Sequence, residues 1–207
     1  MDFETLASGE SIAKVVAALK ERNVEGISVK DRVEAMEKIK EFIPKGASVN
    51  TGASTTLEQI GFVEYLKSGT HGWNNLKGAI ATEKDAEKQA VLRREALLSE
   101  FYLGSVHGLA ETGEFVVGSN TGSQLPHIAY SSQNLILVVS TKKIVPTLLD
   151  AIRRLEEHVV PLEDARMKKA SDGKYGTRLS KEIIFRYESP FNKRKIRMLL
   201  VSENLGF

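Results

Sequence analysis

The stretch NLILVVS at residues 134–140 is apolar on both of its alternating faces. Successive side chains of a strand point to opposite faces of the sheet, so this run needs apolar cover on both sides. Strands of this kind are typical of parallel sheets that lie between two layers of helices. We therefore predict that residues 134–140 form the central strand of an α/β protein.

Shorter segments with regular apolar patterns precede and follow this strand in the sequence. Alternating apolar runs predict further strands, and apolar residues at helical spacing predict helices between them. The expected strands cover residues 24–30, 47–50, 101–106, 114–118, 182–188 and 195–202. The expected helices cover residues 9–23, 31–43, 55–67, 82–100, 123–131, 144–160 and 162–170, with Pro161 as a break between the last two.

The alternation of strands and helices predicts the fold class. It indicates a three-layer α/β sandwich with a largely parallel sheet. The first helix is expected to be an N-terminal extension that packs on the body, and the turn SPFNKR at residues 189–194 is expected to join a C-terminal strand pair. The basic residues of this region, Lys193, Arg194, Lys195 and Arg197, are typical of an exposed strand edge.

Bulk properties exclude several classes of protein. The 207 residues are 42% hydrophobic and 27% charged, which predicts one folded domain over residues 1–207 with residues 1–23 as its helical extension. Basic residues exceed acidic ones by only 29 − 27 = 2, which argues against a nucleic-acid partner. The chain has no cysteine, so it can form no disulfide and can bind no zinc ion or iron–sulfur cluster through thiolates. Without a leader or a long apolar run, we expect a cytoplasmic protein with no membrane contact.

The loop in VNTGASTTLEQIG, residues 49–61, is rich in small hydrogen-bonding residues. Thr55 and Glu58 fit a capping box at the start of the next helix. The remaining amides suit a carboxylate or phosphate, which makes Asn50, Gly52, Ser54 and Thr55 candidate ligand-binding residues. A capped turn without a ligand explains the composition equally well. The loop has no Walker lysine and no dinucleotide fingerprint.

Two later loops have similar chemistry. The stretch GSNTGSQLP at residues 118–126 adds Asn120, Thr121 and Gly122 as candidate ligand-binding residues, and VVSTKKIV at residues 138–145 adds Lys143. If the sheet is parallel, all three loops gather along its carboxyl edge, where open α/β sheets bind ligands. We therefore expect a small anionic metabolite there, although solvation alone also accounts for Lys143.

The segment VHGLAETGEF at residues 106–115 contains the candidate catalytic residues. Beside the glycine loops, Glu111 is a candidate base or nucleophile, and His107 is a candidate for proton transfer near neutral pH. Gly113 would form the turn between them. The alternative is a surface glutamate at a hairpin and a histidine bonded to backbone. The histidines show no metal-ligand spacing, so we expect no metal and no cofactor.

Four stretches taken together resemble the LUD-domain family, named for lactate-utilisation proteins, over nearly the full chain: IPKGASVNTGASTTLEQIG, LAETGEFVV, VVSTKKIVPTLLDAI and RMLLVSENLGF. The resemblance implies a fold like the ribose-5-phosphate isomerase (NagB/RpiA) and CoA-transferase superfamily. It also implies a role in bacterial oxidation of L-lactate to pyruvate beside iron–sulfur oxidoreductase partners. The family motifs fall on Gly52, Ser54, Thr55, Glu58, Glu111, Gly113 and Lys143.

The chain departs from the family pattern in two places. Many short relatives carry a cysteine cluster where this chain has SDGKYGTRLSKE, residues 171–182, and a tryptophan or glycine where it has Asn50 and Thr51.

Three hypotheses for the function follow from the sequence. The chain is an accessory component of organic-acid utilisation, a stand-alone enzyme on a phosphorylated or CoA-linked molecule with Glu111 as base or nucleophile, or a non-catalytic interaction module. The base rate for small α/β proteins favours a homodimer.

Overall fold

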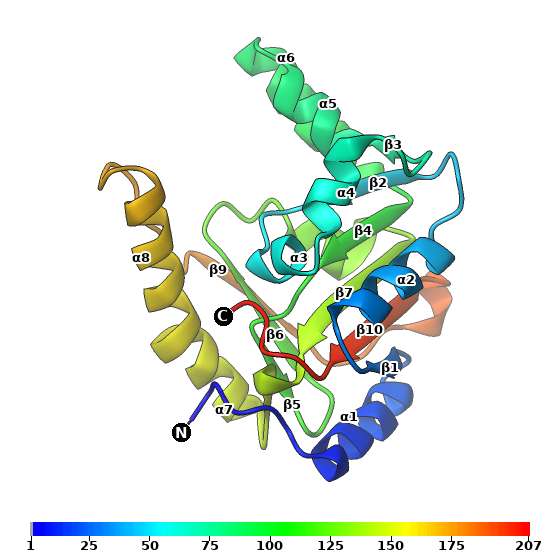
Figure 1. The fold of residues 1–207 in the computed structure, drawn as a ribbon, viewed down its shortest axis with the longest axis vertical. Coiled ribbons are helices and arrows are strands. Elements are labelled where there is room, and N and C mark those ends of the chain that lie inside the picture. The colour runs from blue at the N-terminus through cyan, green and yellow to red at the C-terminus, as the bar shows by residue number, and fades with distance from the viewer. Residues whose placement is uncertain (1) are drawn as a thin grey trace.

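A computed structural model describes residues 2–207 and contains a six-stranded sheet in which every neighbouring pair is parallel (Figure 1). Its strand order is β1-β10-β7-β4-β2-β3. The bounds in that order are Glu25–Val29, Lys195–Val201, Asn134–Ser140, Phe101–Gly104, Ser48–Thr51 and Asn74–Asn75. Strand β7 lies between β10 and β4, which confirms the expectation for residues 134–140.

The side chains of β7 divide between two separate apolar cores. Ile136 and Val138 pack in the core beneath α2 (Arg32–Phe42), α3 (Thr55–Gln59) and α4 (Phe62–Ser68). Leu135, Leu137 and Val139 pack in the core on the opposite face, together with α1 (Gly9–Glu21). This division explains why the sequence of β7 is apolar at every central position.

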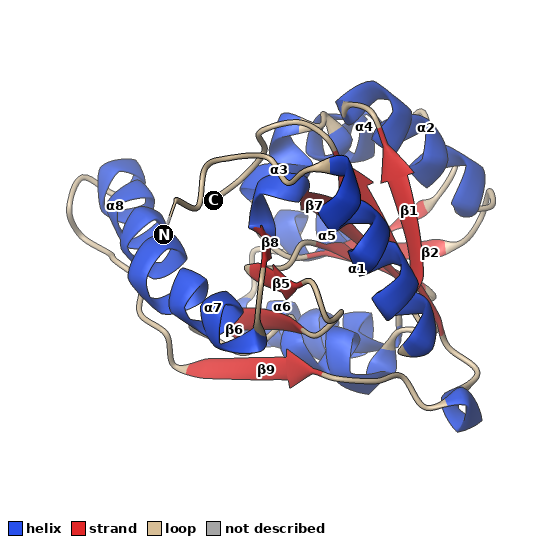
Figure 2. Cartoon of the chain, turned by 90° about the horizontal axis from the view of Figure 1, so that it is seen from below, coloured by secondary structure: helices blue, strands red, loops and turns tan. Residues whose placement is uncertain are grey.

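A second, smaller sheet lies on the α1 side of the first. Its order is β8-β5-β6-β9, with the bounds Ile144–Val145, Gly108–Ala110, Phe115–Ser119 and Lys181–Phe185. A continuous helical segment covers its outer face and consists of α7 (Leu148–Arg153), a π-helical turn (Arg154–Val159) and α8 (Val160–Ala170), as Figure 2 shows. Helices therefore flank the six-stranded sheet on both faces, as expected for a three-layer α/β sandwich.

The remaining elements lie outside these layers. Helices α5 (Leu76–Thr82) and α6 (Ala86–Glu95) project from the body beyond α4 and β2 (Figure 1). Short helical turns complete the structure at Ala96–Leu98, His127–Ser131, Thr141–Lys143 and Pro190–Asn192. No helix within residues 2–207 is both long enough and apolar enough to cross a bilayer.

Several boundaries differ from the sequence predictions. Gly61, at a φ of 81°, separates α3 from α4, so the helix expected over residues 55–67 is two helices. Pro161 does not break the later helix, because the π-helical turn before it lets the chain continue past the missing amide.

The C-terminal strands also pair differently from the expectation. Both form, but β9 pairs with β6 in the small sheet, whereas β10 lies between β1 and β7 in the large one. The expectation that the basic residues around β10 mark an exposed strand edge is therefore wrong, because β10 has a paired strand on each side. Arg194 is buried and pairs with Glu188 at 3.1 Å.

Candidate functional site

Four loops meet at the carboxyl edge of the large sheet. They follow β2, β4, β7 and β10, which are neighbours in the sheet and run in the same direction. A cavity of about 300 Å³ opens between these loops, the β6 loop and the helical segment α7–α8. The cavity therefore lies where parallel α/β sheets place their ligands.

The β2 loop forms one wall of this cavity with Gly52, Ser54 and Thr55. Ser54 is the N-cap of α3, and its Oγ accepts a hydrogen bond from the Leu57 amide at 3.3 Å. The capping box expected from Thr55 and Glu58 is therefore wrong, because the N-cap lies one residue earlier and the residue three positions after it, Leu57, has no side-chain acceptor. Thr55 already belongs to the helix, whose first amides have no intrahelical acceptor, and Glu58 lines the cavity.

Lys143 lies at the cavity wall with only 2% of its surface exposed. Its Nζ donates to Oγ1 of Thr56, Oγ of Ser105 and the carbonyl oxygen of Val106, each at 3.1 Å. These three acceptors satisfy the three N–H bonds of an ammonium group, but none of them carries a negative charge. Burial, followed by the nearby charges of Arg154 and Lys142, lowers the pKa of Lys143 well below its usual value.

Arg154 adds a second buried cation behind Lys143. It is fully buried, and it donates to the carbonyl oxygen of His107, to an oxygen of Phe207 and to the carbonyl oxygen of Phe3. Its Nε has no partner within residues 2–207. Burial lowers the pKa of Arg154 to about 10.

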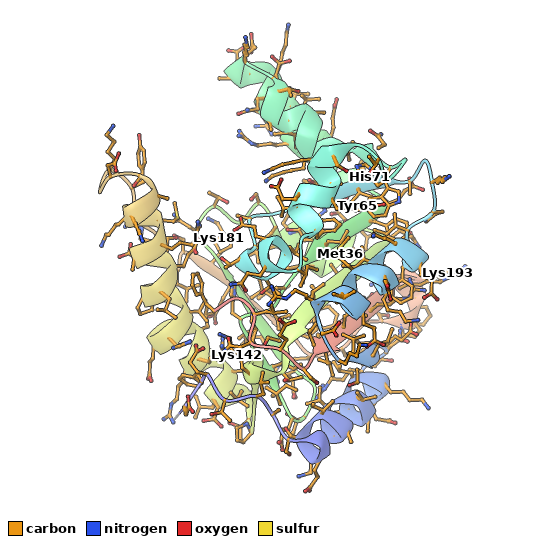
Figure 3. The ribbon with its side chains drawn as sticks, in the orientation of Figure 1. Met36, Tyr65, His71, Lys142, Lys181 and Lys193 are labelled. Atoms are coloured by element: carbon orange, nitrogen blue, oxygen red, sulfur yellow. The ribbon has the colours of Figure 1, made fainter. Side chains whose placement is uncertain are left out.

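Lys142, unlike Lys143, forms an ion pair with a side-chain carboxylate. Its Nζ lies 2.9 Å from Oε2 of Glu4, and Figure 3 shows it beside the N-terminal segment. Glu4 also accepts from Nε2 of His158 at 2.9 Å. Nδ2 of Asn204 donates to Glu4 as well, at 3.3 Å. Within residues 2–207, no carboxylate is hydrogen-bonded to Lys143, and no side-chain carboxylate is hydrogen-bonded to Arg154.

His107 lies at the cavity wall as a neutral ring. Its Nδ1 accepts a hydrogen bond from the Gly118 amide at 2.8 Å, which assigns the proton of the neutral ring to Nε2. Burial, with the charges of Lys143 and Arg154, lowers the pKa of His107 to about 3. The proton transfer near neutral pH expected of His107 does not agree with this environment, which makes the ring a hydrogen-bond donor.

The second predicted loop reaches the same cavity from the small sheet. It follows β6, which is antiparallel to its neighbours, so only two of the three loops belong to the parallel sheet. Asn120 and Thr121 line the cavity, and Oδ1 of Asn120 accepts from Oγ of Ser180 at 3.1 Å. Gly122 forms the turn of this loop at a φ of 85° and is not part of the cavity wall.

Charged side chains from the α8 side complete the cavity. Arg166 makes two hydrogen bonds to Glu163, at 2.7 and 2.6 Å, and both residues line the cavity. Arg178 also lines it and is exposed. Together with Glu58, these residues surround the polar interior with both signs of charge.

Three other candidate residues lie away from this cavity. Glu111 accepts from Oγ of Ser11 at 2.6 Å and lies 4.0 Å from Nζ of Lys14, so it faces α1. Gly113 turns against α1 as well, where a Cβ would lie 2.9 Å from the Arg22 side chain. Asn50 is buried beneath the loop, 3.2 Å from Nε2 of His127. The expectation that Glu111 lies beside the glycine loops is therefore wrong.

The structure also adds residues that the sequence analysis missed. Ser105 follows β4 directly, so its place at the end of a strand was a usable signal. Arg154 lies in a helical stretch whose pattern gives no sign that this arginine is buried. Gly206 crosses the Lys143 end of the cavity at a φ of 66°, and a Cβ there would lie 3.1 Å from Nζ. Nothing in the sequence marks this contact.

The chemistry of the cavity suits a small anion. Hydroxyl groups, backbone amides and the His107 N–H supply donors, and among the described residues no carboxylate is hydrogen-bonded to the buried Lys143. No group of three or more histidine or acidic side chains within residues 2–207 is arranged to hold a metal ion. Hydrogen-bond donors therefore gather at the Lys143 end of the cavity, whereas Glu58 and Glu163 line other parts of its wall.

Comparisons with known proteins agree with this fold. A family model described as the LUD domain matches residues 12–182. The crystal structure of a DUF162 family protein from Deinococcus radiodurans is similar to this chain, with a TM-score of 0.53 and 11% sequence identity. The similarity covers 95% of this chain and 98% of that one, and at this identity it concerns the fold alone. No curated protein matches the sequence significantly.

Proposed function

The chain belongs to the LUD-domain family, and we propose that it binds a small organic anion, a carboxylate or a phosphate ester, in the Lys143 cavity. In this proposal the protein is an accessory component of lactate-type organic-acid utilisation. The family name supports the metabolic setting, and the cavity supports the class of ligand.

Among residues 2–207, no carboxylate is hydrogen-bonded to Lys143, and this observation carries the proposal. A buried ammonium group is costly unless a negative charge lies beside it. Lys143 and Arg154 share the interior near the cavity, and the closest ion pair neutralises Lys142 instead. An anion bound within reach of Nζ would supply the missing charge, and it would raise the pKa of Lys143 as it binds.

Iron–sulfur oxidoreductase subunits are the proposed partners. A chain without cysteine cannot hold a cluster through its own thiolates, so electrons from an organic acid would leave through another protein. Glu111 faces α1 rather than the cavity, so its position lends no support to a role as base or nucleophile in a stand-alone enzyme. Co-purification with such subunits, and the mass of the complex in solution, would test this part of the proposal.

Calorimetric titration tests the binding itself. We expect L-lactate, glycolate or inorganic phosphate to bind the wild type with uptake of protons, because a bound anion favours the charged form of Lys143. The uptake appears as a dependence of the binding enthalpy on the buffer. Lys143→Met should lose at least about tenfold in affinity, which corresponds to about 1.4 kcal/mol.

Lys142→Met is the matched control. It removes an adjacent buried lysine that is already paired with Glu4, so it should leave ligand affinity within about twofold of the wild type. Equal affinity losses in the two variants, or no binding of any of the three anions to the wild type, would contradict the proposal.

A further inference from the structure

We propose that Lys143 is a nucleophile that forms a reversible imine with a small aldehyde or ketone carrying a carboxylate or phosphate group. This inference rests on the proposed function, because the same cavity would hold the anionic end of the molecule. It goes further by assigning a covalent step to one residue and a carbonyl group to the ligand.

The contacts of Nζ leave the amine chemically available. Its three partners are two hydroxyl groups and one carbonyl oxygen. A hydroxyl group can either accept a proton from an ammonium group or donate one to a neutral amine, so the contacts of Thr56 and Ser105 suit both protonation states. A protein carboxylate in their place would hold the ammonium form permanently, and that form is not nucleophilic. The anionic group of the ligand does not replace these contacts, because Nζ is to bond to the carbonyl carbon of the same molecule.

Neighbouring cations favour the neutral amine. A lysine that is desolvated, or that lies beside another cationic group, is activated as a nucleophile because it loses its proton more readily. Lys143 has both conditions, since it is 2% exposed and has Arg154 and Lys142 as charged neighbours, and each of these effects is larger than the opposing effect of Glu4. Both neighbours are held in place, Arg154 by backbone oxygens and Lys142 by Glu4.

The proposed step needs no oxidant or reductant. The lone pair of Nζ attacks the carbonyl carbon and forms a C–N bond, while the carbonyl oxygen takes up a proton. The resulting carbinolamine loses water, which carries away the original oxygen, and a C=N bond remains. The Thr56 and Ser105 hydroxyls lie at 3.1 Å from Nζ, within reach to relay the protons. The ligand's own negative charge then stabilises the protonated imine.

Reductive trapping tests this step on the intact wild-type chain. Glyoxylate is added at neutral pH with cyanoborohydride, which reduces an imine to a stable carboxymethyl adduct. Peptide mapping then compares Lys143 with Lys142, its equally buried neighbour. We expect at least about tenfold more adduct on Lys143, because Lys142 is paired with Glu4 whereas Lys143 is hydrogen-bonded to no carboxylate in the described part of the chain.

Two controls separate covalent capture from simple binding. Glycolate has the same carboxylate without the carbonyl group, so it should compete with glyoxylate and reduce labelling without forming an adduct. Lys143→Arg keeps a cation but has no nucleophilic amine, so it should give no adduct. Lys143→Met provides the same test if arginine does not fit.

The outcomes distinguish this inference from the proposed function. Glycolate binding without any adduct on Lys143 would overturn the imine and leave anion binding intact. Equal labelling of Lys142 and Lys143 would overturn it too, because that pattern reflects unselective modification. If neither glycolate nor glyoxylate binds, and no adduct forms, the proposed function fails along with the inference.

Discussion

Nζ of Lys143 lies 3.1 Å from Oγ1 of Thr56, although the two residues are 87 positions apart. The contact exists because β7 and β2 flank β4 in one parallel sheet, so the loops after these strands meet at one edge. The Lys143 amine is thereby buried among neutral oxygens.

The stability of the wild type relative to Lys143→Met should increase with pH. Burial lowers the pKa of Lys143 below the usual 10.5, so the unfolded chain binds more protons between the folded pKa and 10.5. Stability from this residue is therefore complete above pH 10.5 and is lost as the pH falls through the folded pKa. Urea denaturation of both proteins from pH 7 to 10 measures the difference. Parallel curves would refute the prediction.

His107 should remain neutral from pH 5 to pH 8, because burial and nearby cations lower its pKa to about 3. Nitrogen-detected NMR should show the proton on Nε2 throughout this range, since Nδ1 accepts from the Gly118 amide. The unfolded histidine titrates near 6.5, so its contribution to stability is present above that pH and is lost toward pH 3. His107→Gln should show a shallower loss of stability in acid. Titration of the ring near pH 6.5 would contradict this account.

Gly206→Ala should destabilise the protein and weaken ligand binding. Gly206 has a φ of 66°, and a Cβ there would overlap Oγ1 of Thr56 and lie 3.1 Å from Nζ of Lys143. Gly173→Ala is the matched control, because Gly173 has a φ of 81° and open space around its Cβ position. We expect Gly173→Ala to cost about 1 kcal/mol and to leave binding unchanged. Thermal denaturation and calorimetry should show a larger effect on both quantities for Gly206→Ala.

Gly52→Ala should force the β2 loop away from Tyr102. A Cβ on Gly52 would lie 2.8 Å from the Tyr102 hydroxyl oxygen, which is buried without a hydrogen-bond partner of good geometry within residues 2–207. Tyr102→Phe alone should be neutral or slightly stabilising, because it removes a buried unsatisfied hydroxyl.

The double variant Gly52→Ala/Tyr102→Phe should therefore recover part of the stability and ligand affinity that Gly52→Ala loses. A double-mutant cycle of unfolding free energies measures this recovery as a coupling of about 0.5–3 kcal/mol, the range typical of residues in contact. Strict additivity of the two substitutions would show that the hydroxyl does not constrain the loop.

Glu111→Gln should not reduce anion affinity, because Glu111 faces Ser11 and Lys14 on the α1 side. We expect it to lower the free energy of unfolding by about 1 kcal/mol, the usual contribution of one hydrogen bond. Glu163→Gln should instead raise anion affinity, since it frees Arg166 at the cavity wall from its paired carboxylate. Calorimetry measures the anion affinity of both variants. A large affinity loss in Glu111→Gln would contradict the prediction, because it would show that Glu111 takes part in binding although it faces α1.

The sequence by itself determined the class of fold and the chemistry of its loops. Residues 134–140 are apolar at positions that point to both faces of a strand, which predicts a strand with apolar cover on both sides. This prediction is local, because successive side chains of any strand point to opposite faces. The small polar residues after the strands likewise predict turns that leave amides and hydroxyls available. These are local properties, and the structure contains both.

The tertiary structure alone decided which residues share the cavity. Lys143 meets Thr56, Arg154 meets His107 and Glu111 meets Ser11 across separations of 87, 47 and 100 residues. Such contacts depend on strand order and on the division into two sheets, which the periodicity of single segments does not encode. Whether a lysine has a counter-ion depends on the side chains that the other loops bring beside it. Residue type therefore predicted a lysine at the carboxyl edge, and packing decided that no carboxylate of residues 2–207 is hydrogen-bonded to it.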